Sequence, residues 1–391
     1  MKSHFESYAG RNILEEVKEF VKRDVSPNLR EWEANSHIPE SAWKRMHALG
    51  FWKMAVPRDL GGDQATTQEL TLLMRELAYG SSALATAFTA SIMSGLCIFL
   101  GANAELRKEY GNRILEHGDI SAFAMTEKDG GSDLSNIQTT ATVVPEGYVL
   151  TGEKCFVTNA DQAKHFVVLA RLAHERRTSR GLTMFYIPAG TPGLEVGTPY
   201  KKFGQNGVQT CPISLHDVFI PEKHRIGEPG SAIELSYRVL QRSRTFLAAG
   251  AIGVCCRADD IAREYLSKRI IMRRSLLSQP VIRHLFTQLH TEMEAAWQLI
   301  ISGAQDWDNH ASSLHRINMA KLFAGQVANR FVAAMMELYG GWSYTDTYDI
   351  DQLQKDAKFY EAVEGPAFVQ QILIARGLFP PKVGAAEEAM A

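Results

Sequence analysis

Residues 121–159 read SAFAMTEKDGGSDLSNIQTTATVVPEGYVLTGEKCFVTN, and this stretch carries the clearest local pattern of the chain. FAMTEKDGGSD is typical of a short strand followed by a turn rich in Asp and Gly. TTATVVPEGYVLTGEKCFVTN alternates polar and apolar positions in two runs, as a half-buried β-hairpin does. The turn at 129–133 brings backbone N–H groups and small hydroxyls together, and such groups suit a polar heterocycle or a phosphate. An isolated turn of this kind more often only joins two strands, so both interpretations stay open on this evidence.

Length and composition indicate a multidomain globular protein. A chain of 391 residues is too long for one ordinary core and predicts two or three domains. Its 45% hydrophobic and 22% charged residues are ordinary for a soluble protein, and a net charge of −2 gives no reason to expect nucleic acid or an anionic membrane as a partner. We expect no apolar run of the ~18 residues that a membrane span needs. The N-terminus has no apolar signal core, and five cysteines show neither metal nor disulfide spacing, so we expect a cytoplasmic protein without a metal site.

Three predicted domains follow from changes of pattern along the chain. LTLLMRELAYGSSALATAFTASIMSGLCIFLGA is apolar nearly all round, which is typical of helices packed against other helices. From about residue 120 the chain reads as strands separated by Gly, Pro and Asn, and helical spacing returns near residue 233. The predicted domains are an all-helical domain at 1–118, a β domain at 119–228, and an antiparallel helical bundle at 229–380 with helices at about 233–269, 279–307, 314–338 and 351–376, followed by a flexible tail at 381–391.

The motifs of residues 121–159 occur in an order that resembles a known family. Aromatic-x-Met-Thr-Glu, Gly-Ser-Asp, Thr-Thr-Ala, Gly-Tyr-x-Leu-x-Gly-x-Lys and aromatic-x-Thr-Asn resemble the flavin-binding β domain of the acyl-CoA dehydrogenases. RIGEPG at 225–230 is similar to the linker that follows that domain, and the resemblance covers about residues 10–378. It implies a mostly α fold with a central β domain: an N-terminal helical domain, a barrel-like middle domain and a C-terminal four-helix bundle. It also implies FAD as the cofactor.

Glu364 is the residue that the resemblance places as the catalytic base. It lies in KDAKFYEAVEGPAFVQQILIAR, before a Gly and near the start of the last helix. Removing a proton alpha to a thioester needs a base in an apolar pocket, where burial strengthens a carboxylate as a base. The alternative is that Glu364 only stabilises a helix N-terminus. Glu361, three residues earlier, is the local competitor, and the base that some family members carry on an earlier helix is absent because Ser243 stands there.

The resemblance also assigns cofactor and substrate residues. The predicted flavin-binding residues are Phe123, Met125 and Thr126 along the first strand, Gly131 and Ser132 in the turn, Phe156 and Thr158 in the hairpin, and Arg269, Met272, Gly340 and Gly341 in the bundle. The predicted substrate-binding residues are Ser132, Arg244, Val363 and Gly365. Phe156 would stack on the flavin, although a strand aromatic is more often plain core. Arg269 would reach the pyrophosphate from a neighbouring subunit, and Arg244 fits equally well a substrate entrance or a buried ion pair.

Several residues depart from the family pattern near the expected cofactor. Met272 stands where an aromatic is common, and Pro280 and Glu337 stand where Gln is usual. Pro366 replaces Thr, and Phe368 replaces a polar residue that contacts the flavin in the family. These changes bear on how tightly FAD binds and leave Glu364 in place.

The resemblance predicts FAD-dependent α,β-dehydrogenation of an acyl thioester, on CoA or on an acyl carrier protein. Electrons would pass to an electron-transfer flavoprotein or to oxygen, and the protein would be a homodimer or homotetramer. The cluster Lys268, Arg269, Arg273 and Arg274 would suit an acidic carrier protein, or is simply a solvated helix face. Two other functions stay open: a flavin oxidase or monooxygenase on the same fold, and a flavin-less paralogue acting as a binding subunit.

Overall fold

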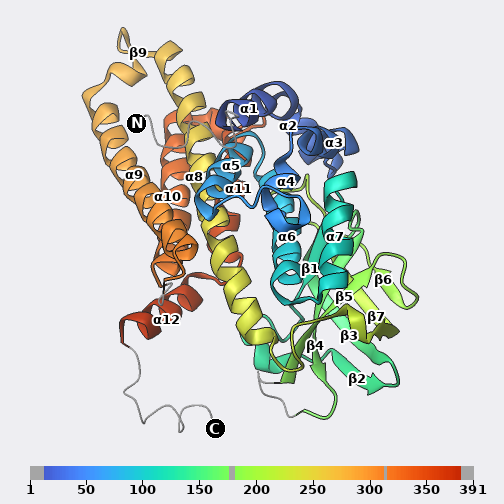
Figure 1. Cartoon of the computed structure of the whole chain (residues 1–391). Helices are drawn as coiled ribbons and strands as arrows, with labels where there is room; N and C mark the ends of the chain where they lie inside the picture. The colour runs from blue at the N-terminus through green and yellow to red at the C-terminus, as the bar shows by residue number, and fades with distance from the viewer. Residues whose placement is uncertain (1–12, 176–180, 312–314, 380–391) are drawn as a thin grey trace. The chain divides into compact units, whose positions relative to one another are not determined.

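The computed structural model describes residues 13–175, 181–311 and 315–379. Contacts between Cα atoms divide the chain into two compact units, unit 1 (Met1–Thr66 and Ala83–Ser243) and unit 2 (Thr67–Ser82 and Arg244–Ala391). Helices precede Ser121, strands occupy the middle of the chain, and helices return from Ala232, which is the predicted order of elements (Figure 1). The domain boundaries at residues 118 and 228 stay a prediction, and the predicted tail at 381–391 lies outside the described residues.

Unit 1 contains most of the N-terminal helices. They are α1 (Ile13–Phe20), α2 (Leu29–Asn35), α3 (Glu40–Ala48), α4 (Phe51–Ala55), α6 (Ser82–Gly101, whose first residue belongs to unit 2) and α7 (Ala104–His117). Helix α6 is apolar nearly all round and is buried accordingly; Phe88 on it packs edge-on against Trp52 of α4, with ring centroids 4.9 Å apart. Asn159, at the end of the quoted stretch, donates from its amide to the carbonyl oxygens of Ala87 (2.8 Å) and Ser121 (3.2 Å). These bonds tie the strands to α6.

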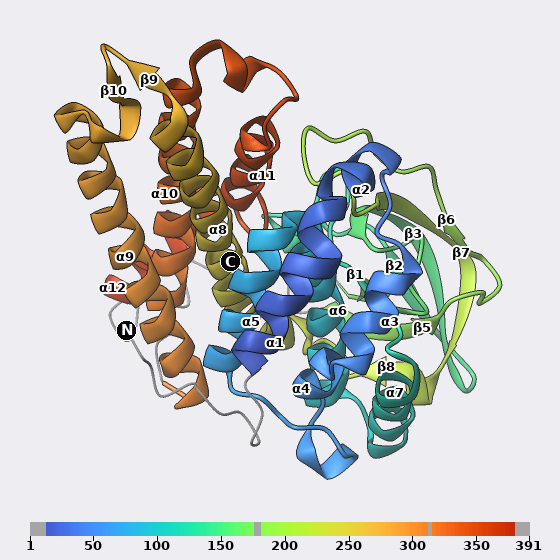
Figure 2. The ribbon, with the colours of Figure 1, turned by 90° about the horizontal axis from the view of Figure 1, so that it is seen from above.

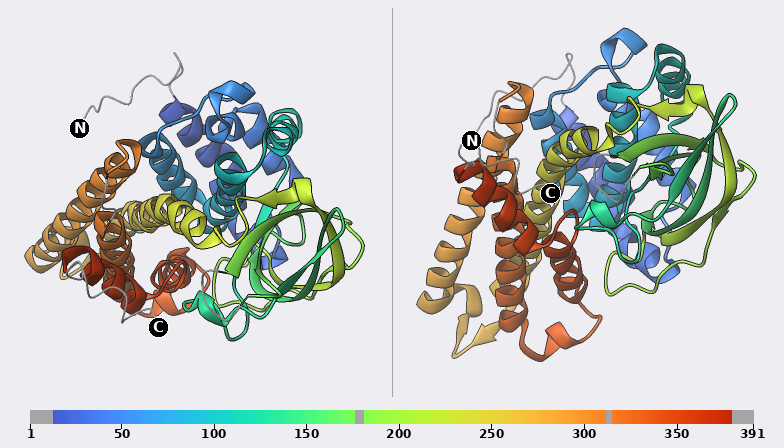
Figure 3. Two further views of the ribbon diagram at one scale, coloured as in Figure 1. Left: turned by 60° about the horizontal axis from the view of Figure 1, so that its bottom comes forward. Right: turned by 90° about the horizontal axis from the view of Figure 1, so that it is seen from below.

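The sheet of unit 1 carries the quoted stretch. Its strands are β1 (Ser121–Ala124), β2 (Thr140–Val144), β3 (Gly147–Thr158), β4 (His165–Leu172), β5 (Leu182–Pro188), β6 (Leu194–Val196), β7 (Thr210–Pro221) and β8 (Arg225–Ile226). The strand order is β6-β7-β3-β2-β4-β5-β8, and β1 pairs in parallel with β4. The predicted hairpin is confirmed as β2 and β3, whose antiparallel register closes at Val144 and Gly147. The sheet curves strongly around its own core (Figure 3).

Unit 2 is a helical bundle. It contains α5 (Thr67–Gly80), α8 (Ala232–Lys268) from Arg244 onward, α9 (Pro280–Asp308), α10 (His315–Tyr339), α11 (Ile350–Ala362), α12 (Ala367–Leu378) and the two short strands β9 (Ile270–Ile271) and β10 (Arg274–Ser275). Helices α9, α10 and α11 run alongside the second half of α8 (Figure 2). Small residues on the facing stripes, among them Ala258, Ala320 and Ala324, are fully buried in the shared core.

The fourth predicted helix, residues 351–376, is two helices. Helix α11 ends at Ala362 and α12 begins at Ala367. The chain cannot continue as a helix between them, because Glu364 and Gly365 have φ values of +50° and +98° and Pro366 has no N–H to donate. The prediction of one continuous segment was wrong, but its placement of Glu364 just before the last helix is confirmed.

Two smaller expectations also need correction. The first strand ends at Ala124, so Met125 and Thr126 follow it rather than lie on it. The Met125 carbonyl oxygen accepts a hydrogen bond from the Lys154 ammonium, and the Thr126 carbonyl oxygen accepts one from the backbone N–H of Cys155, both on β3.

The expectation that no run is long enough to span a membrane was also wrong. Helix α6, at 20 residues and a mean hydropathy of 1.9, is long and apolar enough, and 78% of its most apolar window is buried inside the structure.

Candidate active site

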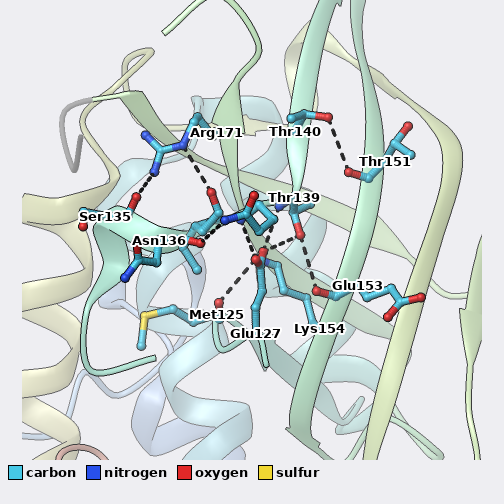
Figure 4. Close-up of polar contacts among 12 residues, drawn as sticks. Met125, Glu127, Ser135, Asn136, Thr139, Thr140, Thr151, Glu153, Lys154 and Arg171 are labelled. Atoms are coloured by element: carbon cyan, nitrogen blue, oxygen red, sulfur yellow. Dashed lines mark hydrogen bonds and ion pairs between the residues drawn. The ribbon is translucent and has the colours of Figure 1, made fainter. Parts of the chain in front are cut away.

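A buried ion pair holds the turn that follows β1. The Lys154 ammonium lies 2.7 Å from a Glu127 carboxylate oxygen, and the two side chains are 0% and 6% exposed. Glu127 also accepts from the backbone N–H groups of Gln138 (2.5 Å) and Thr139 (3.0 Å) and from the Thr139 hydroxyl (2.5 Å). Figure 4 shows these side chains converging at one point, with the Met125 carbonyl also within reach of Lys154. Burial acts to raise the pKa of Glu127, but the Lys154 charge and these hydrogen bonds outweigh it and lower the pKa below its ordinary value.

The far end of the same turn is fixed by Asp133 and Arg171. Asp133 accepts from the backbone N–H (2.9 Å) and hydroxyl (2.7 Å) of Ser135 and from the Asn136 amide (2.9 Å). Arg171, a buried residue of β4, donates to the carbonyl oxygens of Ser135 (2.9 Å) and Ile137 (3.2 Å) (Figure 4). The segment between β1 and β2 is therefore held at both ends by charged groups, with Gly131 half-buried and Ser132 exposed between them.

Phe156 is the predicted flavin-stacking residue, and the structure does not use it as core. Its side chain is 63% exposed, and its φ of +56° lies at a bulge between Lys154 and Val157 of β3. The nearest aromatic ring is that of Tyr200, with centroids 5.0 Å apart. A bulge re-aims the side chain that it carries, and here the side chain of Phe156 is turned out of the core. Phe156 thus presents an aromatic face to which a flat ring could bind.

The other predicted flavin residues of unit 1 lie at the ends of the strands that carry this surface. Phe123, Met125, Thr126 and Thr158 are all half-buried, and the Cβ that a side chain at Gly131 would add lies 3.1 Å from the Thr126 methyl group. The structure therefore brings the turn and the end of β1 together, as the sequence predicts, on the same sheet as Phe156.

In unit 2 a cleft of about 640 Å³ gathers three predicted cofactor residues. Arg269, Gly340 and Gly341 line it, together with Glu337. A Cβ added at either glycine would meet nothing within 4 Å, and Gly340 has a φ of +59°. The surface at these glycines is open to a ligand, and Arg269 offers it a guanidinium, which suits a diphosphate.

Met272, also predicted to bind the cofactor, lies at the tip of the β9–β10 hairpin. It is 88% exposed, and Met272 and Arg273 have φ values of +51° and +64°, as the two central residues of a tight hairpin turn require. Met272 does not line the cleft that Arg269 lines.

Glu364 lies in the turn between α11 and α12, and buried side chains hold its main chain. Its carbonyl oxygen accepts from Nε of Arg244 (3.2 Å) and from the amide of Gln370 (3.0 Å). The next carbonyl, that of Gly365, accepts from the same Gln370 amide (3.0 Å) and from the Lys321 ammonium (2.8 Å). Non-glycine residues rarely adopt a φ of +50°, and four hydrogen bonds at two consecutive carbonyls maintain it here.

The predicted substrate residues of unit 2 surround the same turn. Arg244 is only 4% exposed, and its guanidinium also donates to the Asn318 side chain at 2.9 Å. Arg244 is therefore buried, but these two partners are neutral oxygens, so the ion pair and the place at a substrate entrance both stay predictions. Val363 and Gly365 are half-buried on either side of Glu364.

Sequence reasoning gave no role to Glu127, Lys154, Lys321 or Gln370. Glu127 and Lys154 both belong to the motifs that carry the resemblance, and this could have suggested that they form an ion pair. Lys321 and Asn318 are polar residues on the buried stripe of α10, beside Ile317, Ala320 and Ala324. A polar residue at a core position of a helical pattern is the signal that could have found them. In the described part of the chain no cluster of three or more His, Cys, Asp or Glu side chains could hold a metal ion, and all five cysteines are free.

Comparison with known proteins identifies the family. Three family models match in succession: acyl-CoA dehydrogenase N-terminal domain at residues 9–117, middle domain at 122–218 and C-terminal domain at 233–379. The chain belongs to the acyl-CoA dehydrogenase family. A probable acyl-CoA dehydrogenase of Bacillus subtilis, YngJ, is 28% identical and aligns over 94% of this chain and 97% of its own length. Cyclohexane-1-carbonyl-CoA dehydrogenase of Geobacter metallireducens is 27% identical over 94% and 96%, and the caffeyl-CoA reductase-Etf complex subunit CarC of Acetobacterium woodii is 26% identical over 94% and 97%. The predicted family and enzyme class, an oxidoreductase acting on CH–CH groups, are confirmed.

Solved structures confirm the predicted fold class. A glutaryl-CoA dehydrogenase in complex with glutaryl-CoA has a TM-score of 0.88 at 27% identity and covers 93% of each chain. The FAD complex of PigA has a TM-score of 0.90 at 23% identity over 97% of this chain and 99% of its own. The prolyl acyl carrier protein oxidase AnaB has a TM-score of 0.87 at 22% identity over 94% and 98%. The last two, below 25% identity, show the fold alone; the FAD is that of the PigA complex.

Proposed function

We propose that this protein is an FAD-dependent acyl-thioester dehydrogenase in which Glu364 removes the alpha proton. The observation that carries the proposal is the turn at Glu364. A carboxylate stands there in a left-handed conformation that buried residues of α8 and α12 hold through its main chain. Strain of this kind is maintained where a side chain must point in one direction. A base held in one geometry is what proton abstraction requires.

The cofactor proposal rests on surfaces that fit FAD in each unit. Phe156 offers an aromatic face for a flat ring, and the turn at Gly131 and Ser132 offers backbone and hydroxyl groups beside it. The cleft of unit 2 offers Arg269 to a diphosphate and two open glycines. When bound, FAD supplies the acceptor for the beta hydrogen that leaves as hydride.

The residues of the chain itself then have separate tasks. Glu364 takes the alpha proton on a carboxylate oxygen. The hydrogen bonds from Arg244 and Gln370 keep the Glu364 backbone in place while the charge of its side chain changes. The Glu127–Lys154 pair holds the turn with Ser132, which is exposed and free to hydrogen-bond a ligand.

The thioester carrier, the electron acceptor and the assembly are further parts of the proposal. Relatives act on CoA thioesters by name, and AnaB is named for an acyl carrier protein substrate. We propose a CoA thioester, with a carrier-bound acyl group as the second candidate. An electron-transfer flavoprotein is the proposed acceptor, since CarC is named as part of an Etf complex. We also propose a homodimer or homotetramer located in the cytoplasm, and two exposed apolar residues of the β9–β10 hairpin, Ile270 (60%) and Met272 (88%), support self-association.

A second function, flavin oxidase or monooxygenase, differs in how reduced flavin is reoxidised. Glu364 argues against a monooxygenase, because that reaction has no need for an alpha-proton base. An oxidase would keep Glu364 and differ only in using oxygen as acceptor.

The test is the visible spectrum of the purified protein before and after anaerobic addition of acyl thioesters. A panel of acyl-CoAs and the same acyl groups loaded on a carrier protein would be compared. We expect a flavin spectrum that one class of thioester bleaches, which also names the class. A flavin that no thioester bleaches, or a protein that binds no FAD when FAD is added, contradicts the proposal. Admitting air then separates an oxidase, which recovers its colour quickly, from a dehydrogenase, which needs an electron-transfer flavoprotein.

A further inference from the structure

Helix α10 buries a lysine among alanines. Lys321 is 2% exposed, and its neighbours along the buried stripe of the helix include Ile317, Ala320 and Ala324. An ammonium group loses its hydration when it is buried, and proteins accept that cost only where the group has partners. The partners of Lys321 therefore indicate what it is for.

Those partners are the main-chain carbonyls around Glu364. The Lys321 ammonium donates to the carbonyl oxygen of Gly365 at 2.8 Å and lies 3.4 Å from that of Glu361. Glu361 is in the last turn of α11, where carbonyl oxygens have no partner within the helix and a positive charge is favourable. Lys321 thus joins the end of α11 to the residue that follows Glu364.

The turn needs such a support. Glu364 and Gly365 both have positive φ values, and a side chain at Gly365 would place its Cβ 2.8 Å from the Gln370 amide nitrogen. Gln370 and Arg244 hold the carbonyl of Glu364, while Lys321 and Gln370 hold that of Gly365. Of these three buried donors, Lys321 is the one that also reaches α11.

We propose that Lys321 is a positioning residue for the reaction. Its ammonium fixes the turn that carries Glu364 and keeps a positive charge beside that carboxylate. The inference rests on the proposed role of Glu364 as the base. It assigns Lys321 no contact with substrate or cofactor.

The charges around Lys321 give the proposal a pH signature. Glu364 in the turn, Arg244 on α8 and Glu361 on α11 are the charged groups that act on it. Burial lowers the pKa of Lys321 to about 8, although the Glu364 charge opposes that shift; Arg244 lowers the pKa further and Glu361 raises it. Lys321 would lose its charge near pH 8, where the lowered pKa of Lys154 also lies, so the part of the rate change that disappears in Lys321 variants is the part that belongs to this residue.

The experiment compares Lys321→Met, Lys321→Arg and, as a matched control, Lys358→Met, which removes an exposed lysine of α11 that pairs with the Glu361 side chain. The rate of anaerobic flavin bleaching at saturating acyl thioester would be measured from pH 5 to pH 10, with FAD content and melting temperature for each variant. We expect Lys321→Met to bleach about 10- to 100-fold more slowly, the effect of losing one charge-assisted hydrogen bond. Its acid limb should move to higher pH, because removing a nearby positive charge favours the protonated carboxyl. Lys321→Arg should recover part of the rate and lack the change near pH 8, and Lys358→Met should behave as wild type.

Two results would overturn the inference. One is a Lys321→Met variant with wild-type rate and pH profile. The other is a combination: the rate lost in Lys321→Met is explained entirely by the loss of folded protein, and Lys321→Arg keeps the wild-type change of rate near pH 8. If Lys321→Met does not fold, the profile of Lys321→Arg alone decides. Glu364→Gln separates this inference from the proposed function: an active Glu364→Gln variant refutes the base, whereas an inactive one beside a normal Lys321→Met refutes only the role of Lys321.

Discussion

Two buried lysines, one in each unit, show two ways in which this chain uses an internal charge. Lys154 lies 2.7 Å from the Glu127 carboxylate, and that carboxylate is in turn bonded by Gln138 and Thr139. Lys321 donates instead to neutral carbonyl oxygens, and the carboxylate that acts on it is that of Glu364. The first arrangement neutralises the charge and fixes a turn. The second also fixes a turn, and we propose that its charge in addition acts on the carboxylate of the proposed base.

The largest expected effect is the loss of stability when the Lys154 ammonium is removed. Lys154→Met leaves the Glu127 carboxylate buried without its counter-charge, and such a change costs about 3–5 kcal/mol. Urea denaturation followed by circular dichroism would measure the loss. Lys128→Met, at an exposed lysine of the same turn, is the control and should stay within about 0.5 kcal/mol of wild type. Equal stabilities of the two variants would show that the ion pair does not hold the turn.

A smaller effect tests the burial of Lys321 by pH, and because burial also lowers the pKa of Lys154 to about 8, the test compares wild type with a Lys321 variant. The pKa of Lys321 is about 8 in the folded protein and 10.5 in its ordinary environment, so between these values the unfolded chain binds more protons than the folded one. This group therefore adds stability as the pH rises through that window and adds none below it. Subtracting the stability curve of Lys321→Met from that of wild type, between pH 7 and pH 11, should show a rise. A flat difference would mean that the ammonium is not buried as described.

The smallest effect concerns Phe156, the residue proposed to stack on the flavin. Phe156→Ala should lower FAD affinity by about 0.5–1.5 kcal/mol, the usual size of a stacking contribution. Because the ring is 63% exposed, we expect little change in the stability of the apoprotein. FAD titration by fluorescence quenching would measure the change, with Phe219→Ala as the control, since Phe219 is an exposed aromatic of β7. If Phe219→Ala and Phe156→Ala weaken FAD binding equally, Phe156 has no special role.

Periodicity predicted the parts of the fold whose sequence pattern is local. The β2–β3 hairpin and the long helices α8, α9 and α10 were all expected from spacing and punctuation. The break between α11 and α12 was missed, because its cause is the backbone conformation of Glu364 and Gly365, which buried residues of other helices maintain. Local preference could not show that.

The residues of the candidate site also fall into those that the sequence predicted and those that depend on tertiary packing. Phe156 and Glu364 were predicted through motifs. The structure gives each a positive φ and exposes the Phe156 ring, and their roles stay predictions. Lys321 and Gln370 were missed since their role depends on which helix packs against the turn. A buried polar residue is visible in a sequence as an interruption of an apolar stripe, but its partner is not.

The most direct test of the account is the rate at which an acyl thioester bleaches the flavin of Glu364→Gln, compared with Glu361→Gln. Both variants lose one carboxylate within the same short segment, and both should keep FAD. We expect Glu364→Gln to slow bleaching by about 10²- to 10⁴-fold, as removal of a general base does, and Glu361→Gln to stay within a few-fold of wild type. A Glu364→Gln variant that is bleached at the wild-type rate would contradict the account.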